Sequence, residues 1–191
     1  MEPQNLTVKL YLADSVRLDH KALIPVFHRW IQEHRLDELM IDVADYTHVH
    51  QGPGVMLICH EAHYGLDEGG GRAGLLYSRK RGALGSLDDR FATALRKALS
   101  AARHLETEKD LAGKVAFRGD EIAIGIADRL LAPNTPATLA EVRPALERVL
   151  DRLHGGAPFT VSQVCGPKEC FGVRVSCTGA ADTGTLLGRL G

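Results

Sequence analysis

Histidines gather in one short stretch of the chain, where a single β-hairpin could carry them all. The side chains with metal-binding chemistry in this stretch are His48, His50, Cys59, His60, Glu61 and His63. Imidazole, thiolate and carboxylate groups are ligands for zinc and other divalent transition metals. His48, His60 and His63 are therefore candidate metal ligands, with a divalent transition metal as the possible cofactor. Within one strand, however, His60 and His63 would point to opposite faces, so ordinary surface or hydrogen-bonded histidines are the alternative.

Cysteines offer a second kind of chemistry. Cys165 and Cys170 flank Gly166-Pro167-Lys168-Glu169, a turn across which a disulfide could form if the two Cα atoms lie within about 7 Å. Cys59 and Cys177 occupy matching places in a repeated motif described below, which predicts small buried core residues. Four cysteines without a secretory signal favour reduced thiols in a cytosol.

Two segments could bind an anion or nucleic acid. The glycine-rich segment 69–74 contains Arg72 but does not match the phosphate-binding pattern GxxxxGK[ST], and we expect it to be a loop between two strands. Segment 79–103 is basic and could contact nucleic acid. Because only 5% of the residues are aromatic, we interpret this segment as a solvated helix surface instead.

The composition narrows the class of protein. The chain has 191 residues, a net charge of −1, 45% hydrophobic residues and 25% charged residues, as expected of a soluble globular protein. This charge gives no general attraction to nucleic acid or to anionic membranes. No apolar run approaches the roughly 18 residues that span a bilayer, and residues 1–5 lack the pattern of a signal peptide. We expect a cytoplasmic protein without a membrane partner.

The elements that must position these residues occur twice. Gly54-Val55 begins a run that reads Gly-Val-x-aliphatic-x-Cys-x-x-Ala, and Gly172-Val173 begins another of the same form. An amphipathic helix with a proline near its start, Pro25 or Pro144, precedes each run at nearly the same spacing. An alternating strand ending in Ala-Asp precedes each helix. Three matched elements in one order predict a duplicated β-α-β-β unit.

The duplication predicts an α+β fold made of two tandem ferredoxin-like units, with helices on one face of a mainly antiparallel sheet. We assign residues 1–82 to a first β-α-β-β-β unit and residues 121–191 to a second β-α-β-β unit. Residues 83–120 supply a connecting helix and strand, and the whole packs as one compact domain. Ser86 and Asp89 resemble a capping box at the start of the connecting helix, and the first regular helix should begin near Ala22.

Alternation in the second copy predicts which faces are buried. Val173, Val175 and Cys177 should lie under the helices, which places Val55, Leu57 and Cys59 there in the first copy. With one strand over residues 55–64, Cys59 would lie across from Asp45, and Ile41 and Val43 would share its face. The opposite, open face would then carry Asp42, Tyr46, His48, Met56, Ile58, His60 and Tyr64 from the first copy and Arg174 from the second.

We therefore predict a small-ligand or metal site on, or between, the open faces of the two units, with an unknown reaction. In this site His48 and His60 would act as ligands or as a base, and Tyr46 would be a hydrogen-bond partner. Asp42 would orient a neighbour, and Arg174 would contact an anion. The alternatives are a non-catalytic module that assembles into a homo-oligomer through the same faces and, third, nucleic-acid binding through segment 79–103.

Overall fold

The computed structural model describes residues 1–14, 16–49, 53–111, 113–164, 166, 169–179 and 181–191. His50 and Cys165, both candidates above, lie outside these residues, as do Gln51, Gly52, Pro167 and Lys168 of the predicted turns. The strands are β1 (Leu6–Leu12), β2 (Met40–Asp45), β3 (Val55–Cys59), β4 (Ala62–Asp67), β5 (Gly74–Arg79), β6 (Phe117–Ile126), β7 (Phe159–Val164) and β8 (Phe171–Cys177). The α-helices are α1 (Leu23–Glu33), α2 (Leu87–Thr107), α3 (Pro136–His154) and α4 (Thr183–Leu190), and short 3-10 turns span His20–Ala22, Gly69–Gly71 and Lys109–Leu111.

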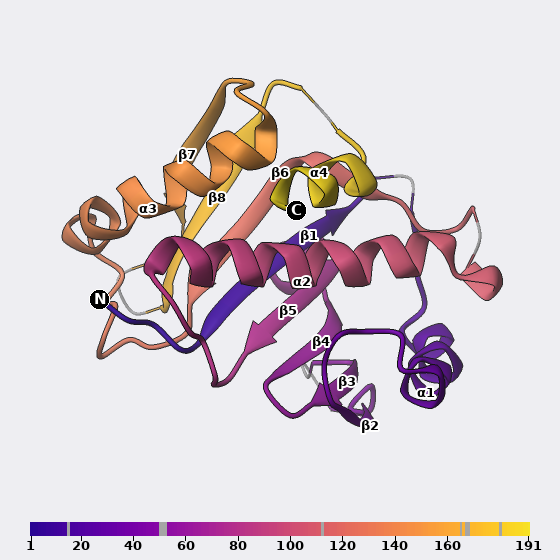
Figure 1. Ribbon diagram of the computed structural model, residues 1–191. Coiled ribbons are helices and arrows are strands. Elements are labelled where there is room, and N and C mark those ends of the chain that lie inside the picture. The colour runs from indigo at the N-terminus through magenta and orange to yellow at the C-terminus, as the bar shows by residue number, and fades with distance from the viewer. Residues whose placement is uncertain (15, 50–52, 112, 165, 167–168, 180) are drawn as a thin grey trace.

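The fold is α+β, with one open antiparallel sheet. Among the described residues the sheet has eight strands in the order β2-β3-β4-β5-β1-β6-β8-β7. Figure 1 shows α2, α3 and α4 in front of this sheet, with α2 crossing β1 and β5. Helix α1 packs beside β2 and β3 at one end of the sheet. The buried side chains form one hydrophobic cluster that runs beneath all four helices.

Local sequence signals explain where the helices begin. The Ser86 side chain accepts a hydrogen bond from the Asp89 backbone while the Asp89 carboxylate accepts one from the Ser86 backbone, so the predicted capping box is confirmed. Helix α1 begins at Leu23 with Ala22 as its N-cap, as expected, which leaves Pro25 in the first turn. Pro144 differs, because it lies inside α3, which begins at Pro136.

The predicted burial of the two matched strands is confirmed. Val55, Leu57 and Cys59 are 0% exposed, and Val173, Val175 and Cys177 are buried as well. The hairpins also match in their end pair, because the first residue of β2, Met40, pairs with Cys59, and the first residue of β7, Phe159, pairs with Cys177. The hairpins differ in their neighbours: β8 lies beside β6, whereas β4 and β5 separate β3 from β1.

Three expectations for the first hairpin are wrong. The predicted strand over residues 55–64 is two strands, because the chain reverses at His60 and Glu61 between β3 and β4. The reversal places Tyr64 opposite Leu57 on the buried face, where Tyr64 is 1% exposed. Cys59 lies across from Met40, and Asp45 lies across from Val55.

The register of β2 contains one further surprise. It shifts between Met40 and Asp42, so Met40 takes the core position that we expected for Ile41. Ile41 is 55% exposed as a result, whereas Val43 keeps the expected face opposite Leu57 and packs against the core.

Candidate functional site

The structure separates the predicted site residues along the first hairpin. The Tyr46 backbone N–H donates to the Gly54 carbonyl (2.8 Å) at one end of this hairpin, and His48 follows in the same exposed loop. The His60 N–H donates to the Leu39 carbonyl (2.8 Å) at the other end. The five residues of β3 lie between, a rise of roughly 17 Å. Tyr46 and His60 therefore do not converge on one ligand.

The remaining candidates lie elsewhere on the open face. Asp42 is exposed on β2, and His63 is half-buried on β4, opposite Ile58 and Ser78. Arg174 lies on β8, in the other half of the sheet, with its Nε 3.3 Å from Glu121 Oε1. Within the described ranges, no three His, Cys, Asp or Glu side chains are grouped as metal ligands would be.

Cys59 is held in a buried polar cluster behind the hairpin. The Tyr64 hydroxyl donates to Glu38 Oε1 (3.0 Å), and Lys97 Nζ lies 4.0 Å from the same oxygen. Burial raises the pKa of the Cys59 thiol to about 12, and the nearby Glu38 carboxylate adds to this effect. The thiol therefore stays protonated near neutral pH, which suits a core residue and not a nucleophile or metal ligand.

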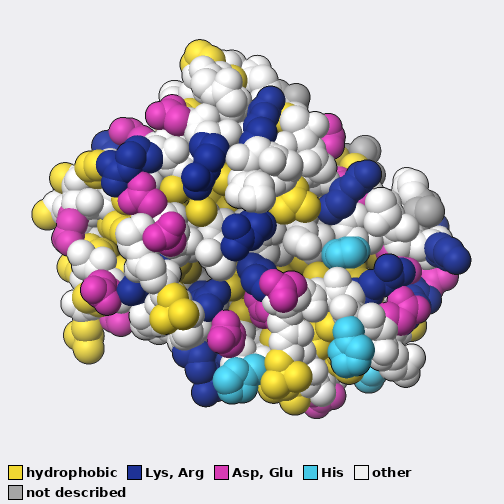
Figure 2. All heavy atoms as spheres, viewed as in Figure 1, with side chains coloured by type: hydrophobic (Ala, Val, Ile, Leu, Met, Phe, Trp, Pro, Cys, Tyr) yellow, Lys and Arg dark blue, Asp and Glu magenta, His cyan; other side chains and the backbone are white. Residues whose placement is uncertain are grey.

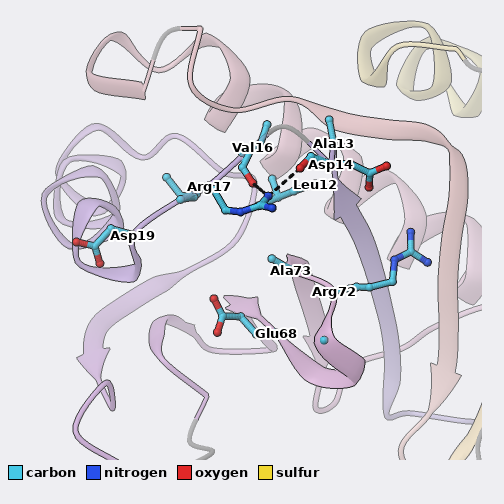
Figure 3. A pocket seen from close by; sticks show the side chains of 11 residues that line it. Leu12, Ala13, Asp14, Val16, Arg17, Asp19, Glu68, Arg72 and Ala73 are labelled. Atoms are coloured by element: carbon cyan, nitrogen blue, oxygen red, sulfur yellow. Dashed lines mark hydrogen bonds between the residues drawn. The ribbon is translucent and has the colours of Figure 1, made fainter.

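Two large cavities adjoin each other where the strands end, beside the last residue of β1, Leu12. The first has a volume of about 750 Å³ and the second about 630 Å³, and Glu68 lines both. We call the pair the end groove. The first cavity lies between residues 12–14 and 16–19, which run from the end of β1 to the 3-10 turn before α1, and residues 68 and 71–73 of the β4–β5 loop (Figure 3). The second is lined by His20, Tyr46, Thr47, Val49, Gly54, Leu66, Asp67, Glu68, Gly69 and Gly70.

Hydrogen bonds fix one wall of the first cavity. The N–H of Leu12 donates to the Ala73 carbonyl (3.0 Å), and that of Val16 donates to the Ala13 carbonyl (2.8 Å). Arg17 Nη1 donates to the carbonyls of Asp14 (2.7 Å) and Val16 (2.8 Å), and Figure 3 shows these two bonds across the top of the cavity. Arg17 thus folds back on its own loop, with its guanidinium beside the cavity.

The β4–β5 loop forms the other wall and is supported from beneath. Lys9, which is 7% exposed, donates from Nζ to the carboxylate of Asp67 and to the Gly69 carbonyl (3.1 Å). Arg72 stacks over the Tyr11 ring at 4.0 Å and forms two hydrogen bonds with the Glu121 carboxylate (2.5 and 2.9 Å). The hydrogen bonds from Arg72 lower the pKa of Glu121, so this ion pair persists well into the acidic range.

The second cavity depends on a close approach of His20 to the backbone. A Cβ at Gly54 would lie 2.0 Å from His20 Nδ1, and Gly54 has φ +68°, so only glycine suits this position. His20 Nε2 lies 3.4 Å from Glu68 Oε1. Of the predicted site residues, Tyr46 alone is among those that line this cavity.

Sequence reasoning missed Arg17 and Glu68 of the end groove, and also Lys9 and Tyr11, which support its β4–β5 wall from beneath. Lys9 and Tyr11 alternate with the buried Val8, Leu10 and Leu12, and this alternation places their side chains on the open face. Arg17 and Glu68 belong to loops without a motif, and only the tertiary fold brings these two loops together.

The basic segment 79–103 uses much of its charge within the fold. Arg79 donates to Glu61 (2.9 Å), Arg90 to Glu2 (3.1 Å) and Lys97 to Asp37 (3.1 Å). Figure 2 shows acidic and basic side chains interspersed over the helix-covered side of the molecule.

Comparisons with known proteins assign no identity. The sequence matches no protein-family model, and it matches no curated protein either.

In the described parts of the chain, no helix is long and apolar enough to cross a membrane.

Proposed function

We propose that this protein binds a small polar molecule in the end groove. The observation that carries the proposal is the pair of cavities of about 750 and 630 Å³ that meet at Glu68. Ligand sites are commonly concave, largely preformed and of this order of size, with a few polar groups that orient the ligand. The groove offers such groups in Arg17, Glu68, His20 and Tyr46.

The end groove lies next to the open face of the sheet, on which the sequence analysis predicted the ligand site. The groove begins where β1 leaves the sheet, so Tyr11 and Arg72 connect its wall to the open face. A metal ion remains an alternative ligand, but no described ligand set favours it. For this reason we propose an organic ligand.

We further propose that the fold arose by duplication of a ferredoxin-like unit. The matching end pairs, Met40 with Cys59 and Phe159 with Cys177, support this idea, with β4 and β5 as an additional hairpin in the first unit. Residues 1–82 and 121–191 would be the two units, joined by residues 83–120 and sharing one core. The buried, free thiols of Cys59 and Cys177 support a reducing, cytoplasmic location.

Ligand-observed NMR with a library of small carboxylates, amines and zwitterions tests the groove. The groove variant combines Arg17→Ala with Glu68→Gln, which removes two exposed charges without exchanging them and should not disturb the core. The control is Arg129→Glu, an exposed arginine in the corresponding connection between β6 and α3. We expect compounds that bind wild type to bind the control equally and to lose binding to the groove variant. Hits that bind all three proteins alike would refute the proposal.

A second candidate function is self-assembly through the open face of the first unit. Met56, Ile58 and Leu76 are half-buried neighbours on that face, beside His63. Analytical ultracentrifugation of wild type and Ile58→Glu tests this candidate. A wild-type dimer that becomes a monomer in the variant would support it, and a monomeric wild type would refute it.

A further inference from the structure

We infer that the ligand of the end groove is a zwitterion, with its anionic group at Arg17 and its cationic group at Glu68. This inference rests on the proposed ligand-binding function and names the class of ligand. Amino acids and other small ω-amino carboxylates belong to this class.

Arg17 is a preorganised cation without a carboxylate partner. Its side chain forms two hydrogen bonds in the described structure, both from Nη1 to backbone carbonyls, which are neutral acceptors. Among the described residues, Nε and Nη2 have no hydrogen-bond partner and no ion pair involves Arg17. A guanidinium held in this way can offer its remaining N–H groups to a carboxylate in a fixed geometry.

Glu68 supplies a carboxylate on the facing wall. Figure 3 shows its side chain rising from the β4–β5 loop on the side of the cavity opposite Arg17. The side chain is 64% exposed, and in the described structure its one ion-pair contact is with His20 Nε2 at 3.4 Å. An ammonium group in the groove would therefore meet an available anion at the junction of the two cavities.

Three other charged groups near the groove, those of Arg72, Asp67 and Asp14, already have ionic partners. Arg72 is paired with Glu121, and Asp67 is paired with Lys9. Asp14 lies 3.6 Å from Arg118 Nη1. The Asp19 carboxylate also lines the first cavity and, in the described structure, accepts only from the Lys21 backbone N–H (3.0 Å), so it is a second anion beside Glu68. Arg17 and Glu68 form no ion pair with each other, which leaves a gap for a ligand that bridges them.

Isothermal titration calorimetry with matched probes tests this inference. The zwitterions are the series from glycine to 6-aminohexanoate, and the single-charge controls are hexanoate and hexylamine. We expect one length of zwitterion to bind best. Arg17→Ala and Glu68→Gln should each weaken its binding about tenfold or more, because each removes a charged contact. Arg129→Ala should bind like wild type.

The alternatives give distinct results. Hexanoate that binds as tightly as 6-aminohexanoate, with no effect of Glu68→Gln, would overturn the zwitterion while leaving an anion-binding groove. Hexylamine that binds as tightly, with no effect of Arg17→Ala, would overturn it in favour of a cation. Absence of binding by every member of the series would also overturn the inference. The proposed function itself fails only if library hits ignore the groove variant.

Discussion

The two connections from a first strand to its helix begin alike and end differently. Ala13-Asp14 follows β1 and Ala127-Asp128 follows β6, at opposite ends of neighbouring antiparallel strands. The second connection closes on itself: Asp128 Oδ1 accepts from the N–H groups of Leu130 (3.1 Å) and Leu131 (3.0 Å). In the first, the Asp14 side chain is 89% exposed and the chain borders the larger cavity of the end groove.

The second connection is also fastened to the sheet. Asn134 Nδ2 donates to the carbonyls of Val164 (3.2 Å) and Gly166 (3.1 Å), and its Oδ1 accepts from Gln163 (2.6 Å). Ala132 is 0% exposed. Neither large cavity is lined by residues of this connection. The fold can therefore fill such a corner, so the open corner in the first unit is a specific property of its loops.

The largest effect on stability should come from the closed connection. Asn134→Ala removes the side chain that donates hydrogen bonds to the carbonyls of Val164 and Gly166, where β7 ends. The change leaves these partly buried carbonyls without that donor. We expect the free energy of unfolding to fall by about 2–3 kcal/mol, measured by urea denaturation. A decrease of less than about 1 kcal/mol in the free energy of unfolding would show that these hydrogen bonds stabilise the second connection no more than the first connection is stabilised.

An intermediate effect should appear in the pH dependence of the free energy of unfolding, and its source, His154, also lies in the second unit. His154 at the end of α3 is 3% exposed, and neither ring nitrogen has a hydrogen-bond partner in the described structure. Burial lowers the pKa of His154, with Arg189 adding to the effect. Below about pH 6.5 the unfolded chain binds more protons at His154 than the folded chain does. The free energy of unfolding is therefore unaffected by this histidine above about pH 6.5 and decreases as the pH falls below that value.

His154→Leu should weaken this pH dependence and should not reduce stability at neutral pH, because it removes two unsatisfied buried nitrogens. Burial also lowers the pKa values of His63 and His104, so part of the acid sensitivity should remain. Denaturant midpoints of the two proteins at pH 7 and pH 5 provide the measurement. An unchanged difference between these midpoints would remove His154 from the explanation.

The smallest effect should come from the open connection. Arg17→Ala and Glu68→Gln change exposed side chains, so we expect each to alter the free energy of unfolding by less than about 0.5 kcal/mol. Urea denaturation alongside Asn134→Ala gives the contrast directly. A decrease of about 2 kcal/mol or more in the free energy of unfolding, as expected when a buried polar group loses its partner, would make these residues structural.

The sequence predicted the parts of the fold that local patterns determine. Alternation in β8 was enough to assign the buried face of β3, and the capping box located the start of α2. The reversal at His60 and Glu61 was missed because these residues lack the glycine or asparagine that usually marks a two-residue turn. That reversal moved Tyr64 to the core.

The candidate site was harder to predict than the fold. The histidine cluster drew attention to the first hairpin, but β3 separates Tyr46 from His60. The end groove depends on two loops that are distant in the sequence and meet only because β5 pairs with β1. Arg17 and Glu68 stand in neither a periodic pattern nor a motif, so no local signal marks them.

A two-dimensional ¹H–¹⁵N NMR titration with the zwitterion of the series that binds most tightly tests the central claim most directly. The account predicts saturable shifts of amide signals from residues 13, 14, 16–19 and 67–73, with signals from residues 127–135 unchanged. The shifts should disappear in the Arg17→Ala, Glu68→Gln double variant and persist in Arg129→Ala. Shifts centred on residues 127–135, or shifts in the first connection that survive the double variant, would contradict the account.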